Sequence, residues 1–220
     1  MGGDVISRHQ FVVKCASTVH ELKEAKSLDD TAFGAHHGVT LDELEKIIKV
    51  GKLILLREAG SGKLVGETQL IFEPIDELPY SFAHPVGFCY GTAIDPAFQG
   101  HGLGKILAME QEKAARESGK KELHLTVRVE NYASLRMRTG LGYRIIAYRE
   151  SFYGPSPAND ARVIMSKVLD GNVGGEAVKG AVKVDFDGAY NARTHHFIRD
   201  FLKLGYRGVA VDRKRGILFA

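Results

Sequence analysis

The sequence predicts an α/β protein in which strands and helices alternate along the chain. Segments with the spacing of strands and of helices follow one another as far as residue 169. Of the 220 residues, 44% are hydrophobic and 26% are charged, which favours a packed core over disorder. Residues 123–129 alternate strictly between apolar and polar side chains, which is typical of a strand with one buried face.

The first half of the chain is expected to contain four strands and three helices. The strands are expected over residues 11–15, 53–57, 63–72 and 86–94, and the helices over 18–33, 40–50 and 103–118. Thr40 and Glu43 have the spacing of a capping box, so a helix should begin at residue 40. Gly51 ends that helix. Residues 59–62, which include two glycines, predict the turn of a hairpin.

The second half continues the alternation and then changes in composition. After the strand at 123–129, a helix is expected over 131–139 and strands over 143–148 and 162–168. Residues 170–180 contain four glycines and predict a flexible linker. We therefore expect a main domain over 1–169, a linker over 170–180, and a small β-α-β-β appendage over 181–220.

The appendage is too small, at about 40 residues, to be stable without a partner surface. Its helix carries the apolar residues Phe197, Ile198, Phe201 and Leu202. This stripe needs a partner surface, and we expect the appendage to pack on the sheet edge of its own chain or of a neighbouring subunit. The second alternative would make the protein a homodimer through the appendage.

Charge, hydropathy and cysteine content limit the classes of partner and compartment. A net charge of +3 with no long Lys/Arg run does not favour nucleic acid. No apolar segment is long enough for a membrane span, and the N-terminus lacks a signal-peptide layout. Cys15 and Cys89 lie in apolar runs, which predicts buried free thiols and a cytoplasmic protein. The remaining histidines show no metal-ligand spacing and are expected at the surface or at caps, so no metal is predicted: His36, His37, His84, His195 and His196.

A glycine-rich turn lies between the strand at 86–94 and the helix at 103–118. It reads Gln99-Gly100-His101-Gly102-Leu103-Gly104-Lys105. Glycines let the backbone approach a ligand closely, and a helix start offers unpaired N–H groups and a positive dipole end. The turn therefore predicts an anion site suited to a pyrophosphate. Its spacing matches neither the nucleoside-triphosphate P-loop nor the dinucleotide fingerprint.

Three segments together resemble the GNAT (GCN5-related) N-acetyltransferase family over residues 11–169. They are Thr92-Ala93-Ile94-Asp95-Pro96, Gln99-x-x-Gly102-x-Gly104, and Asn131-Tyr132-Ala133-Ser134-Leu135 with the later Gly142-Tyr143. The resemblance implies a central mixed, mostly antiparallel sheet flanked by helices, with splayed fourth and fifth strands. It also implies direct transfer of an acetyl group from acetyl-CoA to an amine of a peptide, a protein or a small molecule.

The resemblance also implies where the CoA thioester binds. The pantetheine arm would pair with the backbone of Thr92, Ala93 and Ile94, and the pyrophosphate would rest on the turn from Gln99 to Lys105. Asn131 would bond near the pantetheine or the departing sulfur. An N–H near Ile94 would polarise the thioester carbonyl.

The sequence departs from the family pattern at the residues that move protons. Arg138 stands where many members have a tyrosine that protonates the leaving thiolate. An arginine is a poor proton donor. Three roles are open for Arg138: stabilising the thiolate, contacting a CoA phosphate, or being an ordinary solvated helix residue. Phe88 and Thr126 stand where members place a general base, and neither is a useful base.

Tyr90, His124 and Glu67 are the alternative base candidates. Tyr90 is expected to share a strand face with Phe88 and Thr92, and histidine as a residue type exchanges protons near neutral pH. Each of the three could instead be a structural polar group, and a water chain could replace a base. The missing bases motivate a second hypothesis, a CoA-binding sensor or scaffold without catalysis. Tyr153 resembles a substrate-contacting tyrosine in the last hairpin of peptide N-terminal acetyltransferases.

Overall fold

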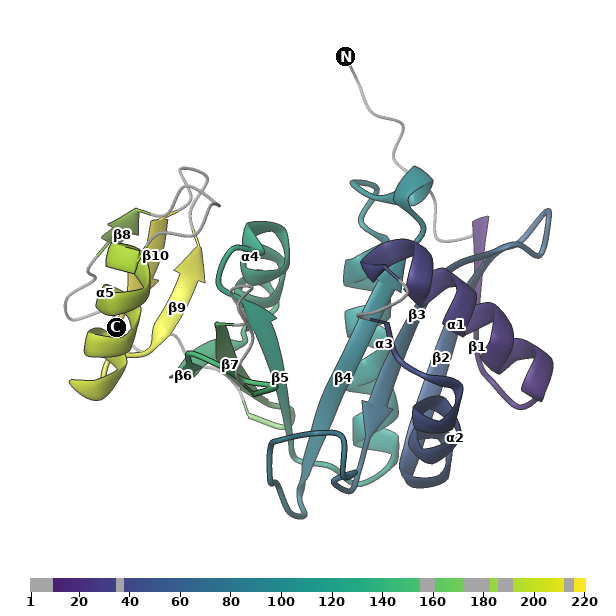
Figure 1. Ribbon diagram of the computed structural model, residues 1–220, viewed down its shortest axis with the longest axis horizontal. Coiled ribbons are helices and arrows are strands. Elements are labelled where there is room, and N and C mark those ends of the chain that lie inside the picture. Colours follow the sequence, from purple (N-terminus) through teal and green to yellow (C-terminus); the bar gives the residue numbers. More distant parts are fainter. Residues whose placement is uncertain (1–9, 35–37, 155–160, 172–182, 186–191, 212–215) are drawn as a thin grey trace. The chain divides into compact units, whose positions relative to one another are not determined.

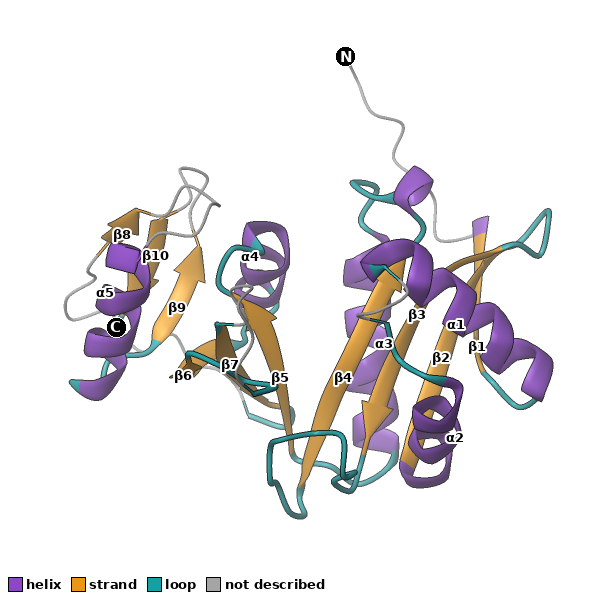
Figure 2. Cartoon of the chain, in the orientation of Figure 1, coloured by secondary structure: helices purple, strands orange, loops and turns teal. Residues whose placement is uncertain are grey.

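A computed structural model of the chain describes residues 10–34, 38–154, 161–171, 183–185, 192–211 and 216–220. The chain forms two compact units, residues 1–120 and residues 121–220. Figure 2 shows that both units combine strands and helices, as the alternation predicts. No helix among the described residues has the length and apolar character needed to cross a bilayer.

The first unit is an antiparallel sheet with helices on both faces. Its strands follow the order β1 (Phe11–Cys15), β2 (Gly51–Glu58), β3 (Leu64–Ile71) and β4 (Val86–Ile94). Its helices are α1 (Val19–Phe33), α2 (Leu41–Val50) and α3 (Leu103–Glu117), with the short 3-10 helix η2 (Pro96–Phe98) after β4. Figure 1 shows α1 and α2 on one face of this sheet and α3 on the other. Both faces of β3 are therefore buried along its whole length.

Side-chain caps fix where the first two helices begin. The Thr40–Glu43 capping box is confirmed: the Glu43 N–H donates to Thr40 Oγ1 at 3.1 Å, and the Thr40 N–H donates to Glu43 Oε2 at 2.7 Å. Thr18 and Glu21 form a second capping box at α1. Two donors satisfied at each start set the helix entry points.

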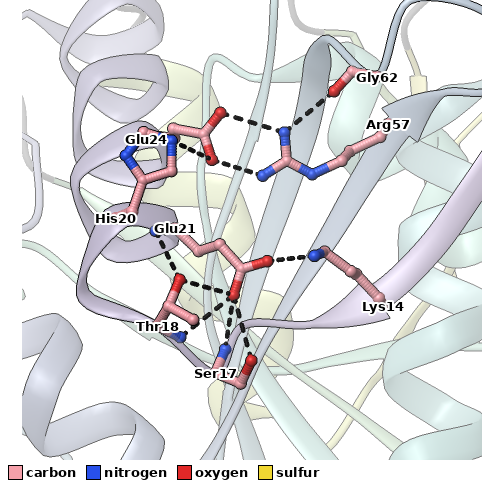
Figure 3. A network of polar contacts seen from close by, with 8 residues as sticks. All are labelled: Lys14, Ser17, Thr18, His20, Glu21, Glu24, Arg57 and Gly62. Carbon is pink, nitrogen blue, oxygen red and sulfur yellow. Dashed lines mark hydrogen bonds and ion pairs between the residues drawn. The ribbon is translucent and has the colours of Figure 1, made fainter.

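Ion pairs join α1 to the first two strands of the sheet, β1 and β2 (Figure 3). Lys14 of β1 pairs with Glu21, and Arg57 of β2 bonds Glu24 through both terminal nitrogens. The Lys14 ammonium is the largest cause that lowers the pKa of Glu21 to about 2, and the Ser17 amide lowers it further. These contacts anchor α1 on the face of the sheet that it covers.

A bulge in β4 changes which side chains share a face. Gln69 is opposite Gly91, but Leu70 is opposite Cys89, so Tyr90 is the extra residue. Thr92 Oγ1 lies 2.6 Å from Thr68 Oγ1, on the α3 face. The Tyr90 hydroxyl instead reaches α2 on the other face. The prediction that Tyr90 and Thr92 share a face is wrong, because the bulge breaks the period of two.

The second unit is a longer antiparallel sheet with two helices. Its strands follow the order β5 (Glu122–Arg128), β7 (Arg162–Val168), β6 (Arg144–Arg149), β9 (Gly208–Val211), β10 (Gly216–Phe219) and β8 (Lys183–Asp185). The helices are α4 (Tyr132–Gly140) and α5 (Ala192–Lys203). Leu123, Leu125 and Val127 are buried and alternate with more exposed neighbours, as the pattern predicts.

The appendage continues the sheet of its own chain. Gly208 of β9 is opposite Ile145 of β6, and α5 packs against β6. A Cβ atom on Gly208 would lie 2.9 Å from Ile145 Cβ, so only glycine permits this approach. The expected packing on the sheet edge of its own chain is confirmed. The homodimer stays a prediction, as do the domain boundaries at 169 and 180; most of the linker lies outside the described residues.

The cysteine prediction is half right. Both cysteines are free, and Cys89 is buried, but Cys15 is exposed. Cys15 ends an edge strand whose burial pattern is mostly exposed, so its apolar neighbours do not cover it.

Candidate functional site

The glycine-rich turn leaves the start of α3 open. Gly102 has a left-handed φ of 82°, and no side chain caps the helix at this residue. The first turn of α3 contains no acidic residue. A Cβ atom on Gly100, Gly102 or Gly104 would meet nothing within 4 Å. The start of α3 therefore has no side-chain cap, and the space beside its glycines is open at the positive end of the helix, which suits a phosphate or pyrophosphate.

Polar contacts hold the turn in this shape. The Ala97 N–H donates to Asp95 Oδ1 at 2.9 Å, and Gln99 Nε2 donates to the Ile94 carbonyl at 3.2 Å. Lys63 Nζ pairs with Asp95 Oδ2 at 2.7 Å, which lowers the pKa of Asp95. Gln99 therefore fixes the path from β4 to α3 through its side chain.

The strand that precedes the turn is held by β3. Thr92 and Ala93 are opposite Thr68 and Glu67 in the ladder. Gln111 of α3 donates to Thr68 Oγ1 at 2.6 Å and to the Gln69 carbonyl at 3.2 Å. These buried hydrogen bonds fix α3 on β3, and β3 pairs with β4. The strand predicted to bind pantetheine and the helix that follows the predicted pyrophosphate turn are therefore both held by β3.

Glu67 belongs to a buried cluster with Asp29 of α1 and Gln69. Glu67 is 0% exposed, and Gln69 Nε2 lies 3.0 Å from both of its carboxyl oxygens. Burial raises the pKa of Glu67 well above its usual value, and the Asp29 carboxylate raises it further. Burial also raises the pKa of Asp29 to about 6, against the opposing hydrogen bond from the Val39 amide. Glu67 therefore binds a proton more tightly than a solvated carboxyl group does, and because it is fully buried, any part it plays in proton transfer must pass through its neighbours.

Tyr90 lies on the same face of the sheet as Glu67. Its hydroxyl donates to Glu43 Oε1 at 3.0 Å, while the other carboxyl oxygen of Glu43 caps α2. A phenol oxygen is by type both a hydrogen-bond donor and an acceptor. Phe88 is fully buried against Tyr80 and Phe82, so the family's usual base position is part of the apolar core.

Asn131 and Arg138 lie at the two ends of α4 in the second unit. Asn131 is the N-cap of α4, where its Oδ1 accepts the Ser134 N–H at 3.0 Å. Arg138 is 5% exposed, and its guanidinium lies 5.3 Å from the Tyr143 ring centroid. Of the three roles considered for Arg138, the ordinary solvated helix residue is excluded by this burial.

His124 and Tyr153 complete the residues predicted from the sequence. His124 Nε2 lies 2.8 Å from Glu122 Oε1, and its side chain is 14% exposed. Tyr153 is 46% exposed in the segment after β6, and the Arg162 guanidinium lies 4.8 Å from its ring. Tyr153 thus has the exposure of a contact residue, whereas His124 is paired and mostly buried.

The sequence analysis missed a polar group built around His195. The prediction that His195 is a surface or capping residue is wrong, because it is 6% exposed and lies between Tyr148 and Glu130. One signal could have found it. Ile198 follows three residues later on the same helix face and is fully buried, so helical spacing places His195 on the buried side.

No cluster of three or more His, Cys, Asp or Glu side chains in the described ranges could hold a metal ion.

Comparisons with known proteins agree with this architecture. The model of the Acetyltransferase (GNAT) family matches residues 22–143. Mycothiol acetyltransferase from Nocardiopsis dassonvillei is 35% identical over 77 residues, which are 35% of this chain and 23% of that protein. The match therefore spans about a quarter of that relative.

Solved structures show the same fold at low identity. The ribosomal-protein-S18-alanine N-acetyltransferase from Escherichia coli superimposes with a TM-score of 0.59 and 17% identity, over 72% of this chain and 94% of that one. The protein yncA from Salmonella typhimurium, whose structure contains acetyl-CoA, gives 0.58 and 16%, over 76% and 99%. These neighbours establish a mixed α/β fold with a mostly antiparallel open sheet flanked by helices.

Proposed function

Because this chain belongs to the GNAT acetyltransferase family, we propose that it is an N-acetyltransferase that transfers the acetyl group of acetyl-CoA directly to an amine. The acceptor would be a peptide, a protein or a small molecule. The open glycine turn at the start of α3 is the observation that carries this proposal. Its uncapped amides and its empty surroundings fit a pyrophosphate.

Each predicted contact of the CoA thioester has a place in this proposal. The amides from Gly100 to Lys105 would hold the pyrophosphate, and the backbone of Thr92–Ile94 would pair with the pantetheine. Asn131 and Arg138 stay predicted contacts of the same molecule. An N–H near Ile94 would stabilise the charge that develops on the thioester oxygen.

The acceptor amine must lose its proton before or during attack. A lysine side chain has a pKa of about 10.4 and an α-amine one of about 7.7–8.0, so both arrive largely protonated. Tyr90 is the first-unit candidate that the geometry favours. It is only half-buried, and its hydroxyl is oriented by Glu43. His124 and Glu67 stay weaker candidates, because the His124 side chain is only 14% exposed and Glu67 is fully buried.

The test compares two substitutions at one position of the turn. Gly104→Glu places a carboxylate over the amides, whereas Gly104→Gln adds a neutral side chain of the same size. Both have room, because a Cβ on Gly104 meets nothing within 4 Å. Calorimetric titration with acetyl-CoA should give at least about tenfold weaker binding for the Glu variant than for the Gln variant, since like charges repel.

A steady-state assay of free CoA release over a panel of peptide α-amines, lysine peptides and small amines tests catalysis. Turnover with one amine class supports the enzyme. Micromolar binding of acetyl-CoA without turnover would favour the alternative of a CoA-binding sensor or scaffold. If acetyl-CoA does not bind to the wild-type protein, both proposals are wrong.

The free thiols of Cys15 and Cys89 support one further part of the proposal. Thiols stay reduced in a reducing compartment. We therefore place the activity in the cytoplasm, which redox-sensitive labelling of Cys15 in cells would test.

A further inference from the structure

Gly91 lies beside the bulge of β4, where a buried glutamine of β3 occupies the space that a side chain would need. Gly91 is opposite Gln69, and beyond the bulge Cys89 is opposite Leu70. A Cβ atom on Gly91 would lie 2.3 Å from Gln69 Oε1 and 3.1 Å from Gln69 Cδ. The side-chain amide of Gln69 therefore rests directly against the β4 backbone, and any larger residue at position 91 would require Gln69 or β4 to move.

Two buried carboxyl groups hold the Gln69 amide in this position. Gln69 Nε2 lies 3.0 Å from both carboxyl oxygens of Glu67, which is opposite Ala93 in the ladder. The Asp29 carboxyl group of α1 interacts with both side chains. Gln69, Glu67 and Asp29 are 1%, 0% and 3% exposed. The amide cannot turn away from the β4 backbone without losing these buried partners.

A second group of hydrogen bonds fixes the same peptide from the α3 face of the sheet. The hydroxyl oxygens of Thr68 and Thr92 lie 2.7 and 2.8 Å from the Gly91 carbonyl oxygen. Gln111 of α3 donates to the Gln69 carbonyl at 3.2 Å. Both carbonyls of the opposed pair Gln69 and Gly91 therefore accept side-chain hydrogen bonds, and polar side chains hold this point of the two strands from both faces.

The energetics of burial separate this arrangement from ordinary core packing. A buried carboxyl group is costly, and replacing buried polar groups by apolar side chains of similar volume is often neutral or stabilising. Such groups can instead fix one arrangement of the backbone. A functional site also needs supporting residues that are locked by hydrogen bonds. The backbone fixed here leads directly into residues 92–94, which are the predicted pantetheine contacts.

We propose that Gln69 and Glu67 are positioning residues for the thioester, because they fix the β4 backbone at Gly91 so that residues 92–94 can pair with pantetheine. The inference rests on the proposed N-acetyltransferase function and deepens it, since it assigns a role to a carboxyl group too buried to take a proton from the acceptor directly. Burial raises the pKa of Glu67, which favours its neutral form. A neutral amide can therefore replace this group as the partner of Gln69.

The experiment uses the full chain and compares two ligands by calorimetric titration. They are acetyl-CoA and 3′-phosphoadenosine 5′-diphosphate, the CoA fragment that keeps the pyrophosphate but lacks pantetheine. Gln69→Ala and Glu67→Leu should each weaken acetyl-CoA binding by about tenfold, and fragment binding by less than about twofold, because only acetyl-CoA reaches residues 92–94. Glu67→Gln should restore acetyl-CoA binding to within about threefold of wild type, since the amide keeps the size and the hydrogen bonds.

A double variant tests whether Gln69 acts through Gly91. Gly91→Ala should also weaken acetyl-CoA binding, because its methyl group displaces Gln69 or β4. Gly91→Ala/Gln69→Ala should bind acetyl-CoA no more weakly than Gln69→Ala alone, because both changes break one contact. Ile71→Val is the matched control, since Ile71 is fully buried on the same face of β3 and the change removes a methyl group but no hydrogen bond. It should leave the ratio of the two affinities unchanged.

The ratio of the two affinities separates positioning from a structural role. Thermal unfolding shows whether each variant is folded; if Glu67→Leu is not, Gln69→Ala decides. A folded Gln69→Ala variant that binds acetyl-CoA like wild type, or that weakens both ligands equally, overturns the inference and leaves the proposed function intact. Losses that multiply in the double variant overturn it as well.

The wild-type protein tests the proposed function separately. A wild-type protein that binds neither ligand contradicts the proposed function itself. If it binds acetyl-CoA but not the fragment, the pyrophosphate site at the glycine turn is wrong, and so is the placement of the thioester on which this inference depends.

Discussion

Asp29 and Glu67 show how much a single buried residue can influence this protein. Both carboxyl groups lie on the α1 side of the first sheet, with Gln69 bonded to Glu67. Asp29 is 3% exposed, and its Oδ2 accepts the Val39 N–H at 2.6 Å. Two nearby carboxyl groups away from water favour the protonated form of at least one. The pair therefore couples the stability of the first unit to pH.

Asp29→Asn should remove part of that coupling. The pKa of Asp29 is raised from 3.8 to about 6, mainly by burial. The folded state thus binds the proton more tightly, and stability falls as pH rises from about 4 to about 6. The amide of the variant cannot titrate, but its oxygen can still accept the Val39 N–H. Urea unfolding from pH 4 to 7 should show the variant gaining roughly 2–3 kcal/mol relative to wild type across this window.

Asp42→Asn makes the same chemical change at a residue outside the buried cluster and serves as the control for this measurement. Parallel stability curves for wild type and Asp29→Asn would show that Asp29 does not hold a proton in the folded protein.

Sequence patterns predicted side-chain positions well only where the backbone is regular. Leu123, Leu125 and Val127 are buried as the alternation requires. The bulge at Tyr90 was not predicted, because the alternation of side chains along one strand does not reveal where a residue has no opposite partner in the next strand. His195 was missed because its partners, Tyr148 and Glu130, are distant in sequence and meet only after α5 packs on β6.

At the scale of elements, the sequence was a better guide, because caps and turns are local. The capping box at Thr40, the hairpin between β2 and β3, and the helix after the glycine turn all lie where short-range chemistry places them. The open start of α3 is likewise a local product of Gly102. Its left-handed backbone directs the chain into the helix without a side-chain cap.

Gly102→Ala and Gly104→Ala should therefore have opposite effects on stability. Gly102 has a φ of 82°, where a Cβ atom costs roughly 1–2 kcal/mol. Gly104 is inside α3 with no positive φ, so alanine there should add up to about 1 kcal/mol. Urea unfolding of the two variants measures the contrast. Steric clash cannot explain it, because neither Cβ would meet an atom within 4 Å. Equal effects would mean that the left-handed turn relaxes and does not define the site.

At the scale of the whole molecule, the sequence predicted the family fold and the existence of the appendage, but not how the appendage is attached. The appendage joins the main sheet where β9 pairs with β6, and this pairing requires the backbone of Gly208 to lie close to the side chain of Ile145. The two residues are distant in the sequence. No local pattern reports such a contact. The packing of α5 on β6 also brings His195 to Tyr148, another contact between residues that are distant in the sequence.

Gly208→Val should weaken the pairing between β6 and β9. Its Cβ would lie 2.9 Å from Ile145 Cβ and 2.8 Å from Ile145 Cδ1, so β9 must shift away from β6. Overpacking of this kind costs about 1–3 kcal/mol, which lowers Tm by several degrees, about 2–4 °C per kcal/mol, in a chain of this size. Ala210→Val is the control, because it adds a larger side chain at a half-buried position of the same strand. Differential scanning calorimetry should show a clear loss for the first variant only.

The double variant Gly208→Val/Ile145→Ala identifies the cause of that loss. Removing the Ile145 side chain beyond Cβ removes the close contacts with Cδ1 and Cγ1 but leaves the one with Cβ, so Gly208→Val should cost less, but still some stability, in the Ile145→Ala background than in the wild type. A Gly208→Val protein as stable as Ala210→Val would instead mean that the appendage is held by the packing of α5 on β6 and by the contacts of β9 with α4, with the strand junction adding little.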